Sequence, residues 1–254
     1  MTSGSGGHLR VGLLECDHVA PHLRHLRGDY ADMFRSLFAR HAPEVELVGY
    51  DVIGGVLPTD PAEQDAWIVT GSRHSVFDDL PWISRLLDLI RRIDAAGRAG
   101  IGICFGHQAI AHALGGRTSR SDRGWGVGIH RSDIVADRPW MQPPLAGIRL
   151  LMTHQDQVAL LPQDATVLGR SAHCEVSMFQ IGDRMVGIQG HPEFTPDYAA
   201  ALLDDRLDRI PPEVVAAARR TLEGQTDEAV VTRWLVAFMR QKVGASPAQN
   251  PPRA

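Results

Sequence analysis

Residues 100–108 read Gly-Ile-Gly-Ile-Cys-Phe-Gly-His-Gln, and this stretch does most to decide the fold. The apolar run Gly100–Cys104 predicts a buried strand, and the helical pattern Gln108–Leu114 follows it closely and ends at two glycines. Glycines on both sides of Cys104 permit the sharp turn that lifts a side chain out of a sheet. A thiol at a helix start also meets unpaired N–H donors, which favour the thiolate. The stretch therefore predicts a nucleophilic Cys104, with the N–H of Phe105 directed at a developing oxyanion.

Strand and helix patterns alternate around this stretch. Apolar runs predict strands over 9–15, 45–50 and 66–70, and helical spacing predicts helices over 30–40 and from Pro81 to Gly97, with Asp78 and Asp79 as candidate caps. Such alternation indicates a parallel sheet with helices on both faces. Further strands are expected over 127–135, 148–152, 166–168, 176–181 and 185–189, with a hairpin at Gly182-Asp183, and helices over 198–207, 212–222 and 228–243. The sequence thus predicts a mainly parallel α/β sheet with an antiparallel extension.

A thiolate nucleophile needs a base, and the base needs a group that orients it. Gly190-His191-Pro192-Glu193 follows a predicted strand and offers both groups on one side of an extended segment. Residues just past the ends of parallel strands meet in one crevice. We therefore expect His191 to act as the base for Cys104 and Glu193 to orient it. Taken alone, this segment would be read as a turn with an exposed histidine and glutamate.

The pair of motifs, GICFGHQ at 102–108 and GHPE at 190–193, resembles the class I glutamine amidotransferase family. The chain order of the cysteine and the His-x-Glu pair matches, as does a glutamine four residues after the cysteine. The resemblance spans roughly residues 9–200. It implies a three-layer, flavodoxin-like α/β fold that hydrolyses the γ-carboxamide of glutamine through a γ-glutamyl thioester. It also places Gln108 among the substrate-binding residues.

Three more segments fit the same resemblance. Thr70–Val76 resembles the family's oxyanion loop, so the N–H of Gly71 would be a second oxyanion donor, although Ser72 stands where many members have a second glycine. Thr153–Val158 resembles the family's SHxDxV loop and places His154 and Asp156 near the substrate's α-amino or α-carboxylate group. Gly124–Gly128 occupies a stretch that often binds substrate, which makes Trp125 a candidate contact. For Thr153–Val158 the residues alone fit a hydrogen-bonded surface loop equally well. The alternative for Thr70–Val76 is an ordinary turn at a strand end, and the alternative for Trp125 is packing beneath its loop.

Composition narrows the function classes. The chain has 254 residues, 44% of them hydrophobic, a net charge of −4 and no basic block, so we expect neither nucleic acid nor a membrane as partner. Three cysteines without a CxxC pattern, and no signal peptide, suggest a reducing cytoplasm. Residues 1–8 and 246–254 are expected to be disordered tails around a single domain at 9–245.

No metal or cofactor is expected. His18, His22 and His25 have a spacing that could hold a metal on a helix, but Pro21 interrupts that helix and no further ligand completes the set. No P-loop or other synthetase-like segment is seen. The expected partners are a small-molecule substrate, glutamine or a γ-glutamyl compound, and a separate synthetase or ammonia acceptor if the released ammonia is used.

Several functions remain open at this point. The resemblance implies a glutaminase-type amidotransferase, or a γ-glutamyl peptidase that cleaves γ-glutamyl isopeptide bonds by the same thioester chemistry. A different enzyme with a cysteine on an elbow, such as an α/β-hydrolase, is disfavoured because its acid would precede the histidine in the chain. A non-catalytic partner that keeps the fold is disfavoured by the intact set of Cys104, His191 and Glu193.

Overall fold

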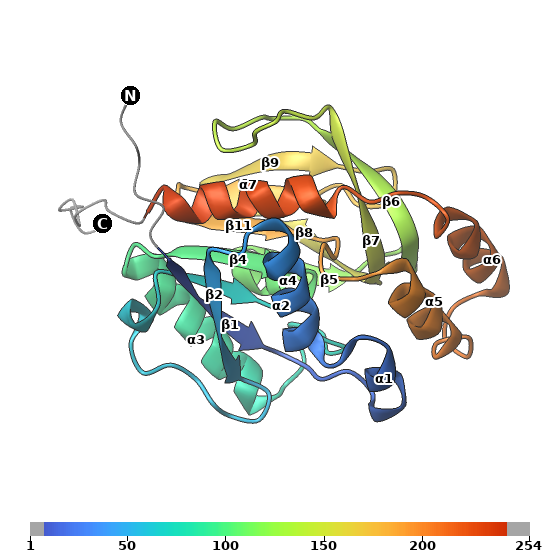
Figure 1. Cartoon of the computed structure of the whole chain (residues 1–254), viewed down its shortest axis with the longest axis horizontal. Coiled ribbons are helices and arrows are strands. Elements are labelled where there is room, and N and C mark those ends of the chain that lie inside the picture. The colour runs from blue at the N-terminus through green and yellow to red at the C-terminus, as the bar shows by residue number, and fades with distance from the viewer. Residues whose placement is uncertain (1–7, 243–254) are drawn as a thin grey trace.

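The computed structural model describes residues 8–242, and a mixed sheet lies at its centre (Figure 1). Within these residues the sheet has nine strands in the order β2-β1-β3-β4-β11-β10-β9-β6-β7. The strands are β1 (Leu9–Glu15), β2 (Val45–Asp51), β3 (Ala66–Val69), β4 (Ala99–Ile103), β6 (Gly126–Ile134), β7 (Gly147–His154), β9 (Ala165–Arg170), β10 (Met178–Ile181) and β11 (Met185–Ile188). From β2 to β11 neighbouring strands are parallel, and from β11 to β7 they are antiparallel. The predicted α/β sheet with its antiparallel extension is confirmed.

Helices cover both faces of the parallel part. On one face lie α2 (Tyr30–His41) and α7 (Glu228–Arg240), and on the other α3 (Pro81–Ala95) and α4 (Phe105–Ala113). The remaining helices are α1 (Arg24–Arg27), α5 (Pro196–Asp204) and α6 (Pro212–Thr221), with short 3-10 turns η1 (Pro21–Leu23) and η2 (Pro61–Glu63). In the view of Figure 1, α5 and α6 lie at the side of the molecule away from α3. No helix among the described residues is long and apolar enough to cross a membrane.

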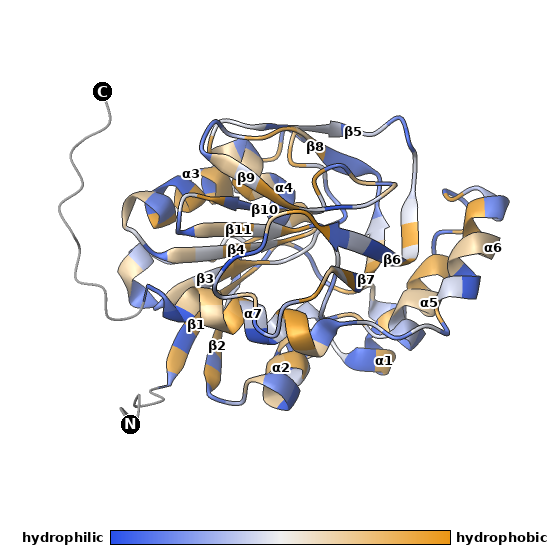
Figure 2. Cartoon of the chain, turned by 90° about the horizontal axis from the view of Figure 1, so that it is seen from above, coloured by the Kyte–Doolittle hydropathy of each residue, from blue (hydrophilic) through white to orange (hydrophobic). Residues whose placement is uncertain are grey.

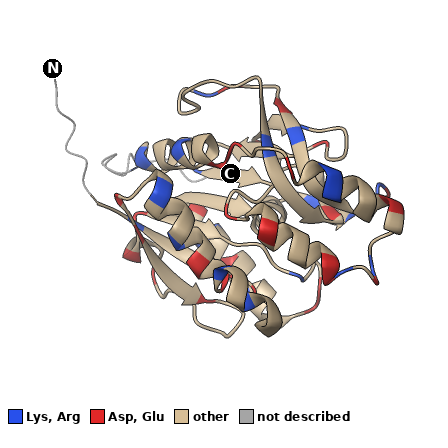
Figure 3. Ribbon diagram, turned by 45° about the vertical axis from the view of Figure 1, so that its right-hand side comes forward, with Lys and Arg blue, Asp and Glu red and all other residues tan. Residues whose placement is uncertain are grey.

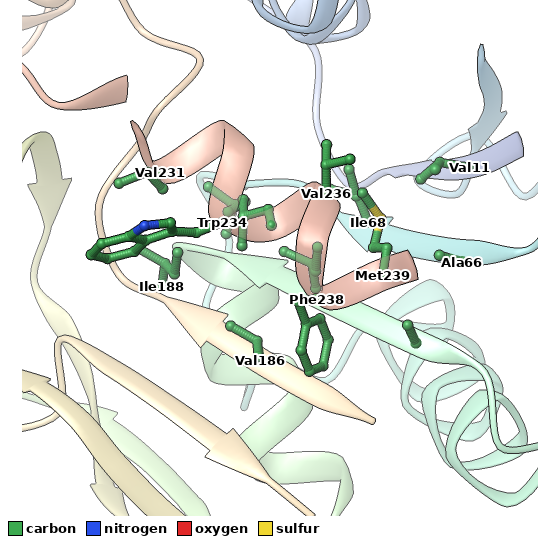
Figure 4. Close-up of a cluster of buried hydrophobic side chains, with 14 of the residues drawn as sticks. Val11, Ala66, Ile68, Val186, Ile188, Val231, Trp234, Val236, Phe238 and Met239 are labelled. Atoms are coloured by element: carbon green, nitrogen blue, oxygen red, sulfur yellow. The ribbon is translucent and has the colours of Figure 1, made fainter. Parts of the chain in front are cut away.

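Two apolar cores lie between the three layers, and alternate side chains of the strands fill both. In Figure 2 the helices that cover the sheet carry both hydrophobic and hydrophilic residues. In β3, Ala66 and Ile68 pack toward α2 and α7, whereas Trp67 and Val69 pack toward α3 and α4. Figure 4 shows the first core, where α7 lays side chains such as Trp234 across the sheet. Fully burying one such large apolar side chain contributes roughly 1.5–3 kcal/mol. Because β1, β3, β4 and β11 are parallel, their carboxyl ends lie on the same side of the packed layers.

Some local predictions were wrong. The residues 156–160 form a strand, β8 (Asp156–Leu160), which pairs with β5 (Arg117–Arg120) as a separate two-stranded sheet. The segment predicted as a loop is therefore two strands with one residue between them. Helix α3 starts after Leu80 with no side-chain cap. The carboxylate of Asp78 instead accepts a hydrogen bond from the N–H of Ser75, 2.9 Å away.

Apart from residue 8, the predicted tails, 1–8 and 246–254, lie outside the described residues. The single domain over 9–245 stays a prediction, and its last residues, 243–245, also lie outside. Acidic and basic residues are interspersed along the helices seen in Figure 3. This distribution agrees with the mixed charge of the sequence.

Candidate active site

Cys104 stands between β4 and α4 on a strained turn. Its φ of 53° is the one positive value among the non-glycine residues described. A side chain at Gly102 would bring its Cβ within 2.2 Å of the Gly106 carbonyl oxygen, and one at Gly106 would come equally close to the Val69 carbonyl oxygen. Since both clashes are with backbone, the two glycines are required for the turn. The Cys104 N–H donates a hydrogen bond of 2.9 Å to the Ile188 carbonyl, which connects the turn to β11.

His191 and Glu193 follow β11, the next strand of the sheet. The N–H of His191 donates to the Leu151 carbonyl at 2.8 Å, which fixes the backbone. Nδ1 of His191 lies 2.7 Å from Oε1 of Glu193, and both side chains are buried. The ring of Phe194 stacks on the imidazole, with centroids 3.9 Å apart and planes 6° apart. The stack on Phe194 thus fixes the plane of the His191 ring, and the contact between Nδ1 and Glu193 fixes its rotation within that plane.

The charges around His191 favour its protonated form. Burial lowers the pKa of His191, but the Glu193 carboxylate and the Cys104 sulfur together raise it by more, to about 10. Cys104 itself is buried, with 6% of its surface exposed. A Cβ atom added at Gly71 would lie 3.0 Å from Cε1 of His191 and 3.8 Å from Cβ of Cys104. The backbone of Gly71 therefore lies next to both residues. The arrangement suits a thiolate beside an imidazolium.

The predicted oxyanion loop follows β3 and lies against α4, the helix that begins after Cys104. The Thr70 carbonyl accepts from the Gly106 N–H at 3.2 Å, and the Thr70 hydroxyl accepts from the Cys16 N–H at 2.9 Å. Gly71 comes next in the chain and lines the cavity beside Cys104. Phe105 holds the first position of α4, where an N–H has no partner within the helix. The structure therefore places Gly71 and Phe105 in the lining of the same cavity as Cys104.

All four predicted substrate contacts line the same cavity as Cys104 and His191: Gln108, Trp125, His154 and Asp156. The side-chain amide of Gln108 already donates to the Asp156 carbonyl at 2.7 Å and to Oε1 of Gln189 at 3.1 Å. Nδ1 of His154 lies 3.1 Å from the same carbonyl, and burial lowers the pKa of His154 to about 3, so its ring is neutral. Nε2 of His154 and Oδ1 of Asp156 are buried without a hydrogen-bond partner among the described residues, and contact of these residues with a substrate stays a prediction.

The N–H of Trp125 is already bonded to protein, so its ring face is the part that remains for a substrate contact. Its Nε1 donates to the Arg209 carbonyl at 2.9 Å, and the guanidinium carbon of Arg206 lies 5.7 Å from the ring centre. Arg206 also donates to Oγ1 of Thr153, at 2.5 Å. No carboxylate among the described residues forms an ion pair with Arg206. A half-buried cation without a carboxylate partner faces the cavity here.

Sequence reasoning missed the arginines of this site. Arg73, Arg120, Arg206 and Arg209 all line the cavity. Arg73 is held by Asp17, which is buried at 2% exposure: the Arg73 N–H donates at 2.8 Å and its Nε at 2.9 Å. These arginines come from separate segments, and no motif or periodicity joined them. Their one signal in the sequence is Arg73, next to Ser72 in the predicted oxyanion loop.

His18, His22 and His107 lie outside the lining of this cavity. His18 sits between Asp29 and Asp51, at 3.1 and 3.2 Å, and His22 meets Asp205 at 2.8 Å. No group of three or more metal-ligating side chains is found within residues 8–242. His107 is fully buried against Phe179, and burial lowers its pKa to about 3.

A thiol on a strand-to-helix elbow, with an imidazole and a carboxylate past the next parallel strand, is an arrangement suited to nucleophilic acyl transfer. Comparison with known proteins identifies the family. The model for glutamine amidotransferase class-I matches residues 48–209, and the chain belongs to this family. The resemblance seen in the sequence motifs is thereby confirmed.

Similar proteins carry more than one activity in their names. The chain is 32% identical to γ-glutamyl peptidase 3 of Arabidopsis thaliana over 206 residues, covering 77% of this chain and 82% of that protein. It is 31% identical to the glutamine-hydrolyzing GMP synthase of Thermomicrobium roseum over 172 residues, 65% of this chain but 30% of that protein. Among solved structures, a glutamine amidotransferase from Thermotoga maritima matches with a TM-score of 0.72 at 22% identity, covering 94% of this chain and 99% of that one. This last likeness confirms the fold.

Proposed function

We propose that the protein is a γ-glutamyl hydrolase that cleaves the γ-amide of L-glutamine or of a γ-glutamyl compound through a thioester on Cys104. The observation that carries the proposal is the geometry around His191. Its ring is fixed by Glu193 at 2.7 Å and stacked on Phe194, and its pKa is raised toward the protonated form beside Cys104. Membership of the amidotransferase family supports the choice of a γ-glutamyl substrate.

The first half of the reaction forms the thioester. His191 takes the proton of Cys104, and the thiolate attacks the γ-carbonyl carbon of the substrate. The N–H groups of Gly71 and Phe105 stabilise the negative charge on the carbonyl oxygen. When this intermediate collapses, the C–N bond breaks and His191 gives its proton to the leaving amine, which is ammonia if the substrate is glutamine.

The second half releases glutamate. Neutral His191 removes a proton from a water molecule, and the hydroxide attacks the thioester carbon. The same two N–H groups stabilise the second oxyanion. The C–S bond then breaks, glutamate leaves, and Cys104 is again a thiolate beside protonated His191. No cofactor enters any step.

The choice of leaving group depends on the open side of the cavity. Arg206 and Arg209 line that cavity and offer guanidinium groups to a carboxylate of the substrate. Likeness to γ-glutamyl peptidases favours γ-glutamyl peptides over glutamine. Likeness to a glutamine-hydrolyzing GMP synthase, of which this chain covers 30%, supports the second candidate, a glutaminase that supplies ammonia to a separate synthetase.

Glutamate release by the purified protein tests the proposal, with L-glutamine and a γ-glutamyl dipeptide as parallel substrates. We expect Cys104-dependent turnover of the dipeptide to exceed that of glutamine, and a γ-glutamyl adduct on Cys104 in mass spectra of acid-quenched samples. Cys174→Ala is the matched control, because Cys174 is also buried and burial raises its pKa to about 12. Turnover that survives Cys104→Ala would contradict the mechanism, and turnover of glutamine alone would favour the glutaminase.

A further inference from the structure

The oxyanion loop is fastened by side chains on both flanks of its turn. On the β1 side, Arg73 pairs with the buried carboxylate of Asp17. On the β8 side, the hydroxyl of Ser75 donates to Oδ2 of Asp156. Ser75 and Asp156 are both buried, with exposures of 8% and 9%. A hydrogen bond to an ionised carboxylate in such surroundings is among the stronger kinds found in proteins.

Asp156 also contacts the helix that carries the nucleophile. Its main-chain carbonyl accepts from Nε2 of Gln108 at 2.7 Å, and Gln108 lies one helical turn after Cys104. Nδ1 of His154 lies 3.1 Å from the same carbonyl. One residue therefore holds the loop of Gly71 through its side chain and the helix of Cys104 through its backbone.

The two oxygens of the Asp156 carboxylate differ in their surroundings. Oδ2 accepts from the hydroxyl of Ser75, whereas Oδ1 is buried without a hydrogen-bond partner among the described residues and lies 3.5 Å from Nε of Arg120. Engagement of Oδ2 by the oxyanion loop fits a role in holding the site together. A contact between Oδ1 and the substrate's ammonium group is the alternative that an experiment has to separate from this role.

We propose that Ser75 and Asp156 are positioning residues, which hold the N–H of Gly71 at a fixed distance from Cys104 through their shared hydrogen bond. The inference rests on the proposed γ-glutamyl hydrolysis. The oxyanion forms only after the thiolate attacks, so loosening its donor weakens the transition state and leaves the bound substrate nearly unaffected. The effect therefore belongs to kcat rather than to KM.

The test measures hydrolysis of a γ-glutamyl dipeptide by the full chain carrying Ser75→Ala. Loss of one oxyanion donor costs about 100- to 1,000-fold in kcat, so partial misplacement is expected to cost about 10- to 100-fold, with KM changed by less than about threefold. Alkylation of Cys104 by iodoacetamide needs no oxyanion donor, and its rate is expected to equal that of the unchanged protein. Ser132→Ala, which removes a buried hydroxyl from β6, is the matched control and is expected to keep kcat.

A double-mutant cycle separates positioning from substrate binding. If both residues act through one bond, Ser75→Ala combined with Asp156→Ala loses no more kcat than the worse single variant. Independent, multiplied losses, or a rise in KM confined to Asp156→Ala, would overturn the inference in favour of an ammonium contact. So would an unchanged kcat in Ser75→Ala, or alkylation slowed as much as hydrolysis. Absence of Cys104-dependent turnover in the unchanged protein would instead refute the proposed function itself, and with it this inference.

Discussion

Replacing Glu193 with glutamine removes a charge from the candidate active site and keeps the shape of the side chain. In the structure, Oε1 of Glu193 lies 2.7 Å from Nδ1 of His191, with both side chains almost fully buried. The carboxylate is the largest of the influences that raise the pKa of His191 to about 10, against burial, which lowers it. The Glu193→Gln change is therefore expected to lower the pKa of His191 and to leave its tautomer unfixed.

The size of the effect on turnover follows from what still holds the ring. In a comparable hydrolase triad, replacing the carboxylate by its amide lowers kcat by roughly 10⁴-fold through the wrong tautomer. Here Phe194 stacks on the imidazole at 3.9 Å and keeps its plane without Glu193. We therefore expect a smaller loss, of about 100- to 1,000-fold in kcat for a γ-glutamyl dipeptide, with little change in KM.

Stability should change with pH in a definite direction. The folded-state pKa of His191, about 10, lies above its ordinary value of 6.5. The stabilisation from this shift is fully present below about pH 6.5 and is lost as pH rises through about 10. In urea denaturation, the free energy of unfolding of the unchanged protein should therefore exceed that of Glu193→Gln by the largest amount at pH 6. The difference should shrink progressively toward pH 10.

The matched control is Glu175→Gln, since Glu175 is an exposed carboxylate paired only with surface arginines in the described part of the chain. It is expected to keep both kcat and stability, because exposed ion pairs contribute about 0–1 kcal/mol. A kcat for Glu193→Gln within threefold of the unchanged protein would refute the orienting role. A stability difference that grows with pH would refute the electrostatic reasoning.

Three further predictions follow from contacts in the structure. Gly106→Ala places a Cβ 2.2 Å from the Val69 carbonyl oxygen, so we expect about 2–3 kcal/mol lower stability in urea denaturation and at least about 100-fold lower turnover; near-normal values would show that the elbow yields. Trp234→Ala empties a fully buried site and removes the N–H that donates to the Pro143 carbonyl at 3.0 Å. We expect the free energy of unfolding in the same assay to fall by about 3–5 kcal/mol, and a loss under about 1 kcal/mol would contradict that packing. Arg206→Gln should raise KM for a γ-glutamyl dipeptide by about 10-fold, the cost of one charged hydrogen bond, and unchanged initial-rate kinetics would remove Arg206 from substrate binding.

The elements with strong periodicity were predictable from the sequence. The apolar stripe of Ile83, Leu86 and Ile90 predicted α3, and the structure buries all three. A hairpin joins β10 to β11 as predicted, with a positive φ at Gly182, but its turn has three residues, 182–184, where Gly182-Asp183 predicted two. Patterns of this kind reflect burial of one face, which each segment requires wherever it packs. Periodicity did not fix the helix boundaries, since α4 begins at Phe105, three residues before its predicted start.

The strands β5 and β8 show where such reasoning stops. Arg117–Arg120 is short and polar, and it is a strand because it pairs with Asp156–Leu160 across some forty residues of chain. Neither segment alternates clearly, so neither predicts a strand by itself. The pairing also brings Arg120 to Asp156.

By itself, the sequence determined the sharp turn at Cys104 and the chain order of Cys104, His191 and Glu193. Gly102, Cys104 and Gly106 lie close together in the chain. A sharp turn restricts only nearby residues, so the spacing of the glycines is enough to reveal it. The tertiary structure alone decided what surrounds that turn: the Ser75–Asp156 bond and the cavity position of Arg206. Such contacts join residues far apart in the chain through single hydrogen bonds or charges. They leave no period in the sequence, because they depend on which strand ends the packed layers bring to one edge of the sheet.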